Sequence, residues 1–331
     1  MKLMGAFRSN SWFFASVGCL IIIPLLFPSL AFINIISEIL IMALFAVSLN
    51  LLIGYTGLIS FGHASFFAVG SYTVGIILQN FSSSLPLAIP LSLLWGMVLS
   101  GIIALPIGYF CTRLSSIYFA FLTLAFSQII YAVIIKWQNL TGGDQGLVGG
   151  IPKPPIVLGG LVIDMSSPFA LYFLIVVAVC ISLLVIKRIT DSPFGWILRA
   201  LRENSARMSF LGIDAKKHQI AVFVISGIFA GLSGGLMALH LSGSYPDHAY
   251  WTKSAEPIFM IMLGGLRTFA GPILGALIVT ELSVYMCKYT GIWGLGFGSF
   301  LVLYLIVIRE GILDVFIKWR ERRRSAISHK K

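Results

Sequence analysis

Apolar residues occur in long blocks along the chain, and charged residues gather almost entirely between these blocks. A helix needs about 20 apolar residues to cross the hydrocarbon core of a membrane. The pattern therefore predicts an all-α integral membrane protein, a polytopic helical bundle that forms a single domain over residues 1–331. About ten membrane segments are expected, at residues 11–30, 33–53, 60–80, 86–111, 115–136, 168–188, 218–241, 254–266, 271–288 and 294–309.

Two of these blocks are weaker than the others. The block at 60–80 is interrupted by glycine, and the block at 254–266 is short. Both are compatible either with a full crossing or with a re-entrant segment that enters and leaves on the same side. The even number of crossings survives if both are re-entrant.

Composition excludes an ordinary soluble enzyme. Hydrophobic residues make up 58% of the chain, charged residues 11%, and the mean hydropathy is +0.97. Soluble domains are typically about 45–50% apolar and about 25% charged. The formal net charge of +11 does not indicate nucleic-acid binding, because the basic residues lie between apolar blocks.

The distribution of Lys and Arg predicts the orientation. If both termini are cytoplasmic, 19 of the 23 Lys and Arg residues fall in cytoplasmic segments, as the positive-inside rule requires. The loop at 137–167 then lies outside, and the loop at 189–217 lies inside. The basic tail at 311–331 is cytoplasmic and is expected to contact anionic membrane lipid.

The inside loop contains an amphipathic helix. Asp191 or Ser192 can cap it, Pro193 suits its first turn, and Gly212 is a natural stop. Its apolar residues repeat with helical spacing, while its arginines are expected on the other side. This pattern favours two interpretations equally: a helix lying on lipid headgroups, and a helix that docks into a partner protein.

Several ordered stretches resemble motifs of the branched-chain amino acid ABC-transporter permeases of the LivM type. Residues 50–64 are similar to that family's N-L-x-x-G-Y-x-G-x-x-S-x-G-H-A, and residues 192–204 to its S-P-F-G-x-x-x-R-A-L-R-E-N. Residues 117–126 with 140–143 are similar to its Y-F-A-x-x-T-L-A-F and L-T-G-G. Residues 262–276 are similar to its L-G-G followed by G-P-x-x-G-A.

The resemblance implies a multi-pass permease subunit of an ATP-driven importer in the bacterial inner membrane, with the 137–167 loop in the periplasm. Its implied partners are a sister permease, two cytoplasmic ATPase subunits and a periplasmic solute-binding protein. The inside helix is then the coupling helix that seats in an ATPase subunit. Its implied coupling residues are Phe194, Arg199, Arg202, Glu203, Asn204 and Gly212. The family's acidic, alanine-rich continuation is replaced here by residues 205–210.

The chain carries no phosphate-binding loop of the G-x-x-x-x-G-K-[ST] type, so ATP is expected to bind to the partner subunits. We therefore expect no enzymatic activity, no cofactor and no metal site. The resemblance implies branched-chain or related hydrophobic amino acids as substrates. Urea or short amides, carried by similar permeases, are the alternative.

Polar residues inside the apolar blocks give further candidates. The glycine-rich stretch at 57–64 is expected to form an irregular turn beside a translocation path, with Ser60, Gly62 and His63 as its candidate residues. A packing role for His63 is the competing interpretation. Glu281 is a candidate path or interface residue. Glu38 or Glu281 would instead serve as a proton relay if the protein were an ion-coupled secondary transporter.

Overall fold

The computed structural model describes residues 29–81, 87–114, 116–147, 150–158, 161–289, 298–299, 302 and 311–315. Nearly all of the predicted segments at 11–30 and 294–309 lies outside these residues, as does most of the basic tail. The other eight predicted segments each coincide with a helix. These helices are α2 (Leu30–Thr56), α3 (His63–Phe81), α4 (Ala88–Cys111), α5 (Ser116–Lys136), α7 (Pro168–Thr190), α10 (Ala215–Leu241), α11 (Trp251–Gly264) and α12 (Gly271–Tyr289).

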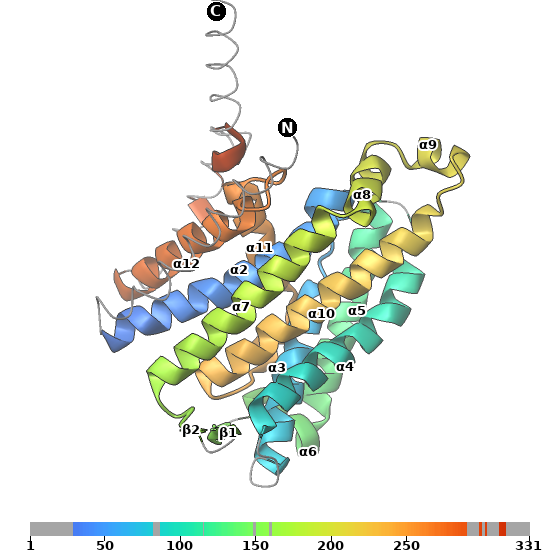
Figure 1. The fold of residues 1–331 in the computed structure, drawn as a ribbon. Helices are drawn as coiled ribbons and strands as arrows, with labels where there is room; N and C mark the ends of the chain where they lie inside the picture. Colours follow the sequence, from blue (N-terminus) through green and yellow to red (C-terminus); the bar gives the residue numbers. More distant parts are fainter. Residues whose placement is uncertain are drawn as a thin grey trace, which may run out of the picture.

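Smaller elements connect these helices (Figure 1). The 137–167 loop contains α6 (Gln138–Thr141), η1 (Gly143–Gln145) and an antiparallel hairpin of β1 (Ile156–Leu158) and β2 (Leu161–Ile163). This hairpin is a small exception to the all-α prediction. The 189–217 loop contains α8 (Pro193–Glu203) and α9 (Ser205–Phe210), and η2 (Pro246–Ala249) precedes α11.

The helices form a membrane bundle. In the described part of the chain, six helices are long and apolar enough to span a bilayer, namely α2, α3, α4, α5, α7 and α10. By comparison, α12 has a shorter apolar stretch, Gly271–Met286, and α11 has only 14 residues. A polytopic helical membrane protein is therefore confirmed, whereas the count of ten segments and the cytoplasmic termini stay predictions.

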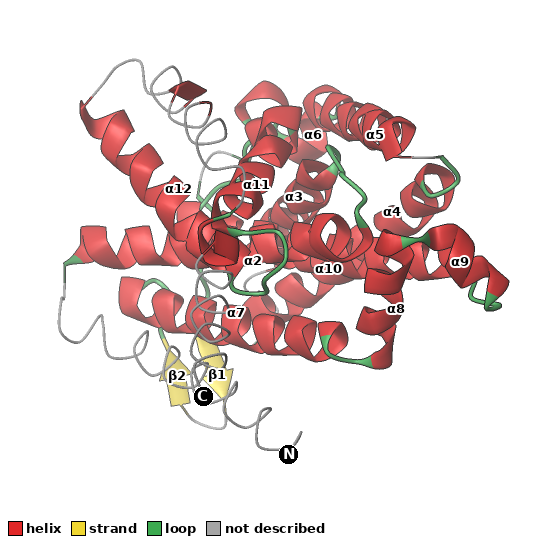
Figure 2. Cartoon of the chain, turned by 90° about the horizontal axis from the view of Figure 1, so that it is seen from above, coloured by secondary structure: helices red, strands yellow, loops and turns green. Residues whose placement is uncertain are grey.

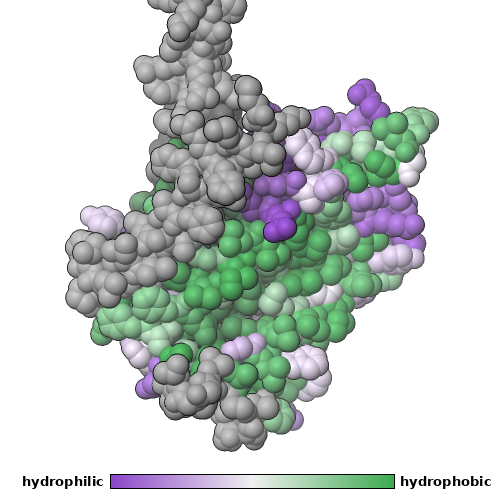
Figure 3. Space-filling view, viewed as in Figure 1, coloured by the Kyte–Doolittle hydropathy of each residue, from purple (hydrophilic) through white to green (hydrophobic). Residues whose placement is uncertain are grey.

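The two ends of the bundle differ. One end carries α8 and α9, and the opposite end carries α6 and the β1–β2 hairpin (Figure 1); we call them the α8 end and the hairpin end. Between them, the visible face is mostly hydrophobic, and hydrophilic residues gather at the α8 end (Figure 3). This is the surface expected of a bundle embedded in lipid.

Helix α10 lies at the centre and packs against α2, α3 and α4 (Figure 2). Its backbone approaches α3 very closely: a Cβ at Gly234 would lie 1.8 Å from the Phe67 carbonyl oxygen, and one at Gly70 would lie 1.9 Å from the Gly231 carbonyl oxygen. Small residues at such crossings let membrane helices pack tightly without a hydrophobic driving force between them. The α3–α10 crossing therefore requires glycine at these positions.

We predict that Gly234→Ala lowers the free energy of unfolding by about 3 kcal/mol, because overpacking costs roughly 1–3 kcal/mol and the atom met here is backbone. The measurement is thermal unfolding of the purified protein in detergent. Gly96→Ala in α4 is the matched control, since its Cβ would come no closer than 3.3 Å to another residue, at the Gly70 carbonyl oxygen. Equal unfolding temperatures for the two variants would contradict the tight crossing.

Candidate functional site: the joint between α2 and α3

The chain leaves helical structure between α2 and α3, and we call residues 57–62 the joint. Helix α2 stops at Gly57, which has a left-handed backbone (φ 75°) that glycine adopts without strain. The N–H groups of Gly57 and Leu58 donate to the carbonyls of Ile53 and Leu52, both at 3.2 Å. This is a Schellman-type helix stop, so the glycine-rich sequence breaks the helix where an irregular turn was predicted.

Other helices supply the partners for the backbone of the joint. The Phe61 N–H donates to the Thr123 hydroxyl of α5 at 3.2 Å. Just beyond the joint, the Ala64 N–H donates to the Ser254 hydroxyl of α11 at 2.8 Å. Gly62 packs so closely on α5 that a Cβ there would lie 2.4 Å from the Thr123 carbonyl oxygen. The joint is thus held by α5 on one side and α11 on another.

His63 anchors the first turn of α3 in the protein interior. Its Nε2 lies 3.0 Å from the Ser226 hydroxyl of α10 and 3.4 Å from the Ser48 hydroxyl of α2. Both hydroxyls donate their own hydrogen to backbone carbonyls, of Ser48 and Phe45 respectively. They can therefore only accept from the ring, which assigns the proton to Nε2. The ring also stacks on Phe45, with centroids 5.9 Å apart.

The structure thus places two of the predicted path residues in packed surroundings. Ser60 and His63 are both fully buried. The Ser60 hydroxyl accepts from the Gly62 N–H at 3.3 Å, within the joint itself. These contacts favour the packing interpretation for His63, and a role in a translocation path stays a prediction for both residues.

Helix α8 begins as predicted, with Ser192 as N-cap and Pro193 in the first turn. The sequence predicted its arginines on the polar side of the helix, but two of them contact the bundle. Arg202 donates to the Gly54 carbonyl, one of the last carbonyls of α2. The Arg199 guanidinium lies 5.0 Å from the centre of the Tyr55 ring and donates to the Thr190 carbonyl at 3.2 Å. Positive charge is favourable at a helix C-terminus, where carbonyls lack helical partners.

The remaining coupling candidates divide between the two sides of α8. Phe194 faces the bundle, where its ring stacks on His218 with centroids 5.8 Å apart. Glu203 and Asn204 are exposed, as is Gly212 beyond α9. Trp196, which the sequence analysis did not single out, is also exposed, at 64%. Arg202 is exposed too, although its guanidinium bonds to the Gly54 carbonyl, and the Arg199 guanidinium lies 5.0 Å from the centre of the Trp196 ring. The outward face of α8 therefore includes arginine as well as Trp196 and Glu203.

The sequence predicted one helix from Pro193 to Gly212, and this was wrong. The chain is extended at Asn204 (φ −159°, ψ 96°), where α8 ends and α9 begins. The Asn204 side chain accepts from the Arg207 N–H at 2.9 Å, so it caps the new helix. A residue that competes with helical hydrogen bonding in this way explains the break.

The membrane carboxylates lie apart from the joint. Glu281 is exposed on α12, in line with the exposed side chains of Leu277 and Tyr285. Glu256 forms an ion pair with Lys253 at 2.7 Å. Glu38 is half-buried on α2. Sequence reasoning missed Lys253 and Ser254, for which no motif gave a signal, whereas Thr123 lies in one of the quoted motifs.

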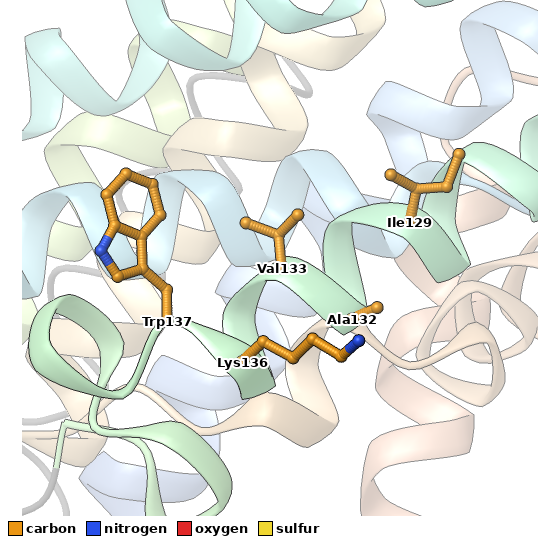
Figure 4. Close-up of a pocket in the computed structure, with 5 residues that line it drawn as sticks. All are labelled: Ile129, Ala132, Val133, Lys136 and Trp137. Atoms are coloured by element: carbon orange, nitrogen blue, oxygen red, sulfur yellow. The ribbon is translucent and has the colours of Figure 1, made fainter.

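A shallow groove of about 420 Å³ lies on the outer face of α5, near the hairpin end (Figure 4). Its lining residues are Ile129, Ala132, Val133, Lys136 and Trp137, all from one short stretch. Exposed apolar side chains followed by Lys and Trp are typical of a helix surface at the membrane–water interface. The groove therefore fits contact with lipid and no transport site.

Two membrane helices joined by an irregular turn, whose backbone bonds in part to other helices, fit a polytopic membrane protein. The family model described as "Branched-chain amino acid transport system / permease component" matches residues 31–308, and the chain belongs to this family. It is thus a multi-pass membrane protein of the ABC-transporter permease class.

Named relatives agree with the family. The high-affinity branched-chain amino acid transport system permease protein LivM of Escherichia coli is 27% identical over 286 residues, which cover 81% of this chain and 66% of that protein. The probable LivM permease of Methanocaldococcus jannaschii is 26% identical, covering 82% of this chain and 86% of that one. The ribose import permease protein RbsC of Haemophilus influenzae is 26% identical, covering 76% and 75%. No solved structure matches the chain.

We predict that His63→Ala destabilises the protein by about 3 kcal/mol, because it opens a cavity and leaves the Ser226 hydroxyl without its donor. Thermal unfolding in detergent measures the change. His240→Ala, at a partly exposed histidine near the end of α10, serves as control and is expected to change little. An unchanged unfolding temperature for His63→Ala would remove the packing role.

Proposed function

We propose that this protein is the membrane-spanning permease subunit of an ATP-driven ABC importer. In this proposal it moves branched-chain or related hydrophobic amino acids that a periplasmic binding protein delivers. ATP is hydrolysed by two separate cytoplasmic subunits, and a sister permease completes the membrane part, so this chain is itself neither an enzyme nor a cofactor-binding protein. Membership of the permease family and the names of the relatives support the proposal.

The proposal also assigns the sides of the membrane. The α8 end is cytoplasmic and the hairpin end is periplasmic, in a bacterial inner membrane. The distribution of basic residues supports this, because the loop that contains α8 and α9 carries several of them. Both chain termini are then cytoplasmic.

The observation that carries the mechanism is the bond from Arg202 to the Gly54 carbonyl. Arg202 belongs to the helix proposed to meet the ATPase, and Gly54 lies three residues before the joint. A displacement of α8 therefore acts directly on the end of α2, and through the joint on α3, α5 and α11. The exposed Trp196 and Glu203 would receive the ATPase, while Arg199 and Arg202 would transmit its movement inward.

The alternatives receive less support. An ion-coupled secondary transporter using Glu38 or Glu281 is not favoured, because the relatives reported above are named as transport-system or import permeases. A urea or short-amide permease of the same type finds no support in those names. The ribose permease among the relatives fits a shared translocation architecture with different cargo.

We predict that Arg202→Gln leaves the ATPase subunits attached but reduces leucine uptake at least tenfold. A hydrogen bond from a charged group contributes about 1.5–3 kcal/mol, and about 1.4 kcal/mol is a tenfold change. Co-purification measures attachment, and uptake of labelled leucine into proteoliposomes with ATP inside and binding protein outside measures coupling. Glu203→Lys, on the outward face, is expected to weaken attachment itself.

Arg113→Gln is the matched control, because Arg113 lies at the same end of the bundle and donates to Tyr109 within its own helix region. It is expected to change neither attachment nor uptake. If wild-type protein purifies alone and takes up leucine without ATP, the ABC proposal is wrong. If Arg202→Gln transports at the wild-type rate, the coupling route through α2 is wrong.

A further inference from the structure

Helix α9 and the turn that follows it expose two large apolar side chains at the α8 end. Phe210 is 92% exposed and Leu211 is 71% exposed. Among the large apolar residues that the structure describes, these two are the most exposed. No residue of α9 is buried. Because contact with water is unfavourable for apolar surface, a partner is expected to cover these side chains.

Basic residues accompany the two apolar side chains. Arg207 is exposed and lies three residues before Phe210, on the same side of α9. Lys216 and Lys217 are exposed in the first turn of α10. Residues 205–217 contain these three basic residues and one acidic residue, which gives a formal net charge of +2. We call Arg207, Phe210, Leu211, Lys216 and Lys217 the α9 tip.

The one acidic residue, Asp214, is engaged at the start of α10. Its carboxylate accepts from the N–H groups of Lys216 and Lys217 at 3.1 and 3.2 Å, and the Lys217 ammonium lies 3.5 Å from it. The bond from the Lys217 N–H lowers the pKa of the Asp214 carboxyl below its ordinary value, so Asp214 stays ionised. Arg207 and Lys216 form no ion pair with any residue that the structure describes. Their charges are therefore available to a negatively charged partner.

The length of α10 places the α9 tip near the lipid head groups. Helix α10 has 27 residues and is about 40 Å long, whereas the hydrocarbon core is about 30 Å thick, so its ends reach the head-group region. The Ile213 N–H donates to the Met208 carbonyl at 3.1 Å, which holds α9 close to the start of α10. Helix α9 forms the outer edge of the α8 end, beyond α8 (Figures 1 and 2). Hydrophobic and hydrophilic residues lie side by side at this corner (Figure 3).

The hydrogen bonds of α9 are local. In the described part of the chain, they are made within α9, to its cap Asn204 or to the turn that follows it. By contrast, Arg202 of α8 bonds to the Gly54 carbonyl of α2. The extended residue Asn204 separates the two helices. A force on α9 would therefore not reach α2 directly, which favours an anchoring role for α9 over a role in coupling to the ATPase.

We propose that the α9 tip anchors the α8 end in an anionic lipid leaflet. Phe210 and Leu211 insert between the lipid head groups, and the three basic side chains bind lipid phosphates. A segment that carries Phe and Leu beside Lys and Arg binds such a surface through apolar burial and electrostatic attraction together. This inference goes beyond the proposed function, because neither ATPase attachment nor the bond from Arg202 to Gly54 requires it.

The test places an environment-sensitive fluorophore at position 211 of the full-length chain. Leu211→Cys is labelled in a background without the four native cysteines, and the protein is reconstituted with its co-purifying subunits in nanodiscs. The discs contain a quencher lipid with a nitroxide near the top of its acyl chain. The surrounding lipid is either phosphatidylcholine alone or a mixture with anionic phosphatidylglycerol. Ser205→Cys, also exposed but at the other end of α9, is the matched control.

In discs with phosphatidylglycerol, the label at position 211 is expected to be quenched about threefold more strongly than the label at position 205, because only the former inserts. In phosphatidylcholine alone, quenching at position 211 is expected to fall, because the attraction between basic residues and anionic lipid is lost.

Further variants separate charge from apolar contact. The combination of Arg207→Gln, Lys216→Gln and Lys217→Gln is expected to remove the difference between the two lipid mixtures. Added salt is expected to reduce this difference in the unsubstituted tip, because salt screens exposed charges. Phe210→Ser is expected to lower quenching at position 211 in both mixtures. All these side chains are exposed, so the unfolding temperature is expected to stay constant, and its measurement excludes misfolding as the cause.

Equal quenching at positions 205 and 211, or equal quenching at position 211 in the two lipid mixtures, would overturn the proposal. The same measurement without the ATPase subunits tests the other candidate partner. A label at position 211 that is shielded from water only when the ATPase is present would make the α9 tip a protein-docking surface, and the lipid proposal would be wrong. ATP-dependent leucine uptake by the wild-type assembly is measured in parallel. Uptake without insertion of the α9 tip contradicts only this inference, whereas absence of uptake contradicts the proposed function.

Discussion

Backbone groups that leave a helix inside a membrane must find hydrogen-bond partners within the protein, because lipid offers none. The joint between α2 and α3 is the place where this constraint acts most strongly. The Phe61 N–H of the joint donates to Thr123 of α5, and the Ala64 N–H at its flank donates to Ser254 of α11. At the end of α2, the Gly54 carbonyl accepts a hydrogen bond from Arg202 of α8. A single break in one helix therefore fixes the positions of several helices at once.

The central position of α10 depends on the same region. His63, the first residue of α3, bonds to Ser226 of α10, and the glycine crossing lies about one to two turns further along α3. Because the crossing is made backbone to backbone, it leaves little freedom for α3 to slide along α10. We infer that movement at the α8 end reaches the interior by tilting or rotating α2 and its joint, while α3 and α10 move together.

Much of the fold could be predicted from sequence, because the length of an apolar block and the position of glycines at helix ends are local signals. Eight apolar blocks became helices with ends close to those expected, and the glycines at 57 and 62 correctly indicated the break. The inward direction of Arg199 and Arg202 could not be predicted. Helical periodicity assigns arginines to water, whereas here Arg202 donates to the Gly54 carbonyl near the end of α2, and the Arg199 guanidinium lies against the Tyr55 ring of the same helix. The partners Ser254 and Lys253 likewise depend on how α11 meets α2 and α3, which no local pattern encodes.

The central claim is that α8 acts on the joint through a direct link at the Arg202 position, and a covalent replacement of that link tests it. A Cβ at Gly57 would lie 3.3 Å from Arg202 Cγ, which is close enough for a disulfide between Gly57→Cys and Arg202→Cys in a background without the four native cysteines. Leucine uptake is measured before and after oxidation, with Gly57→Cys alone as control. The account predicts that the reduced double variant is uncoupled and that oxidation restores uptake while ATPase attachment stays constant. Oxidised protein that remains as inactive as the reduced form, or reduced protein that transports at the control rate, would contradict it.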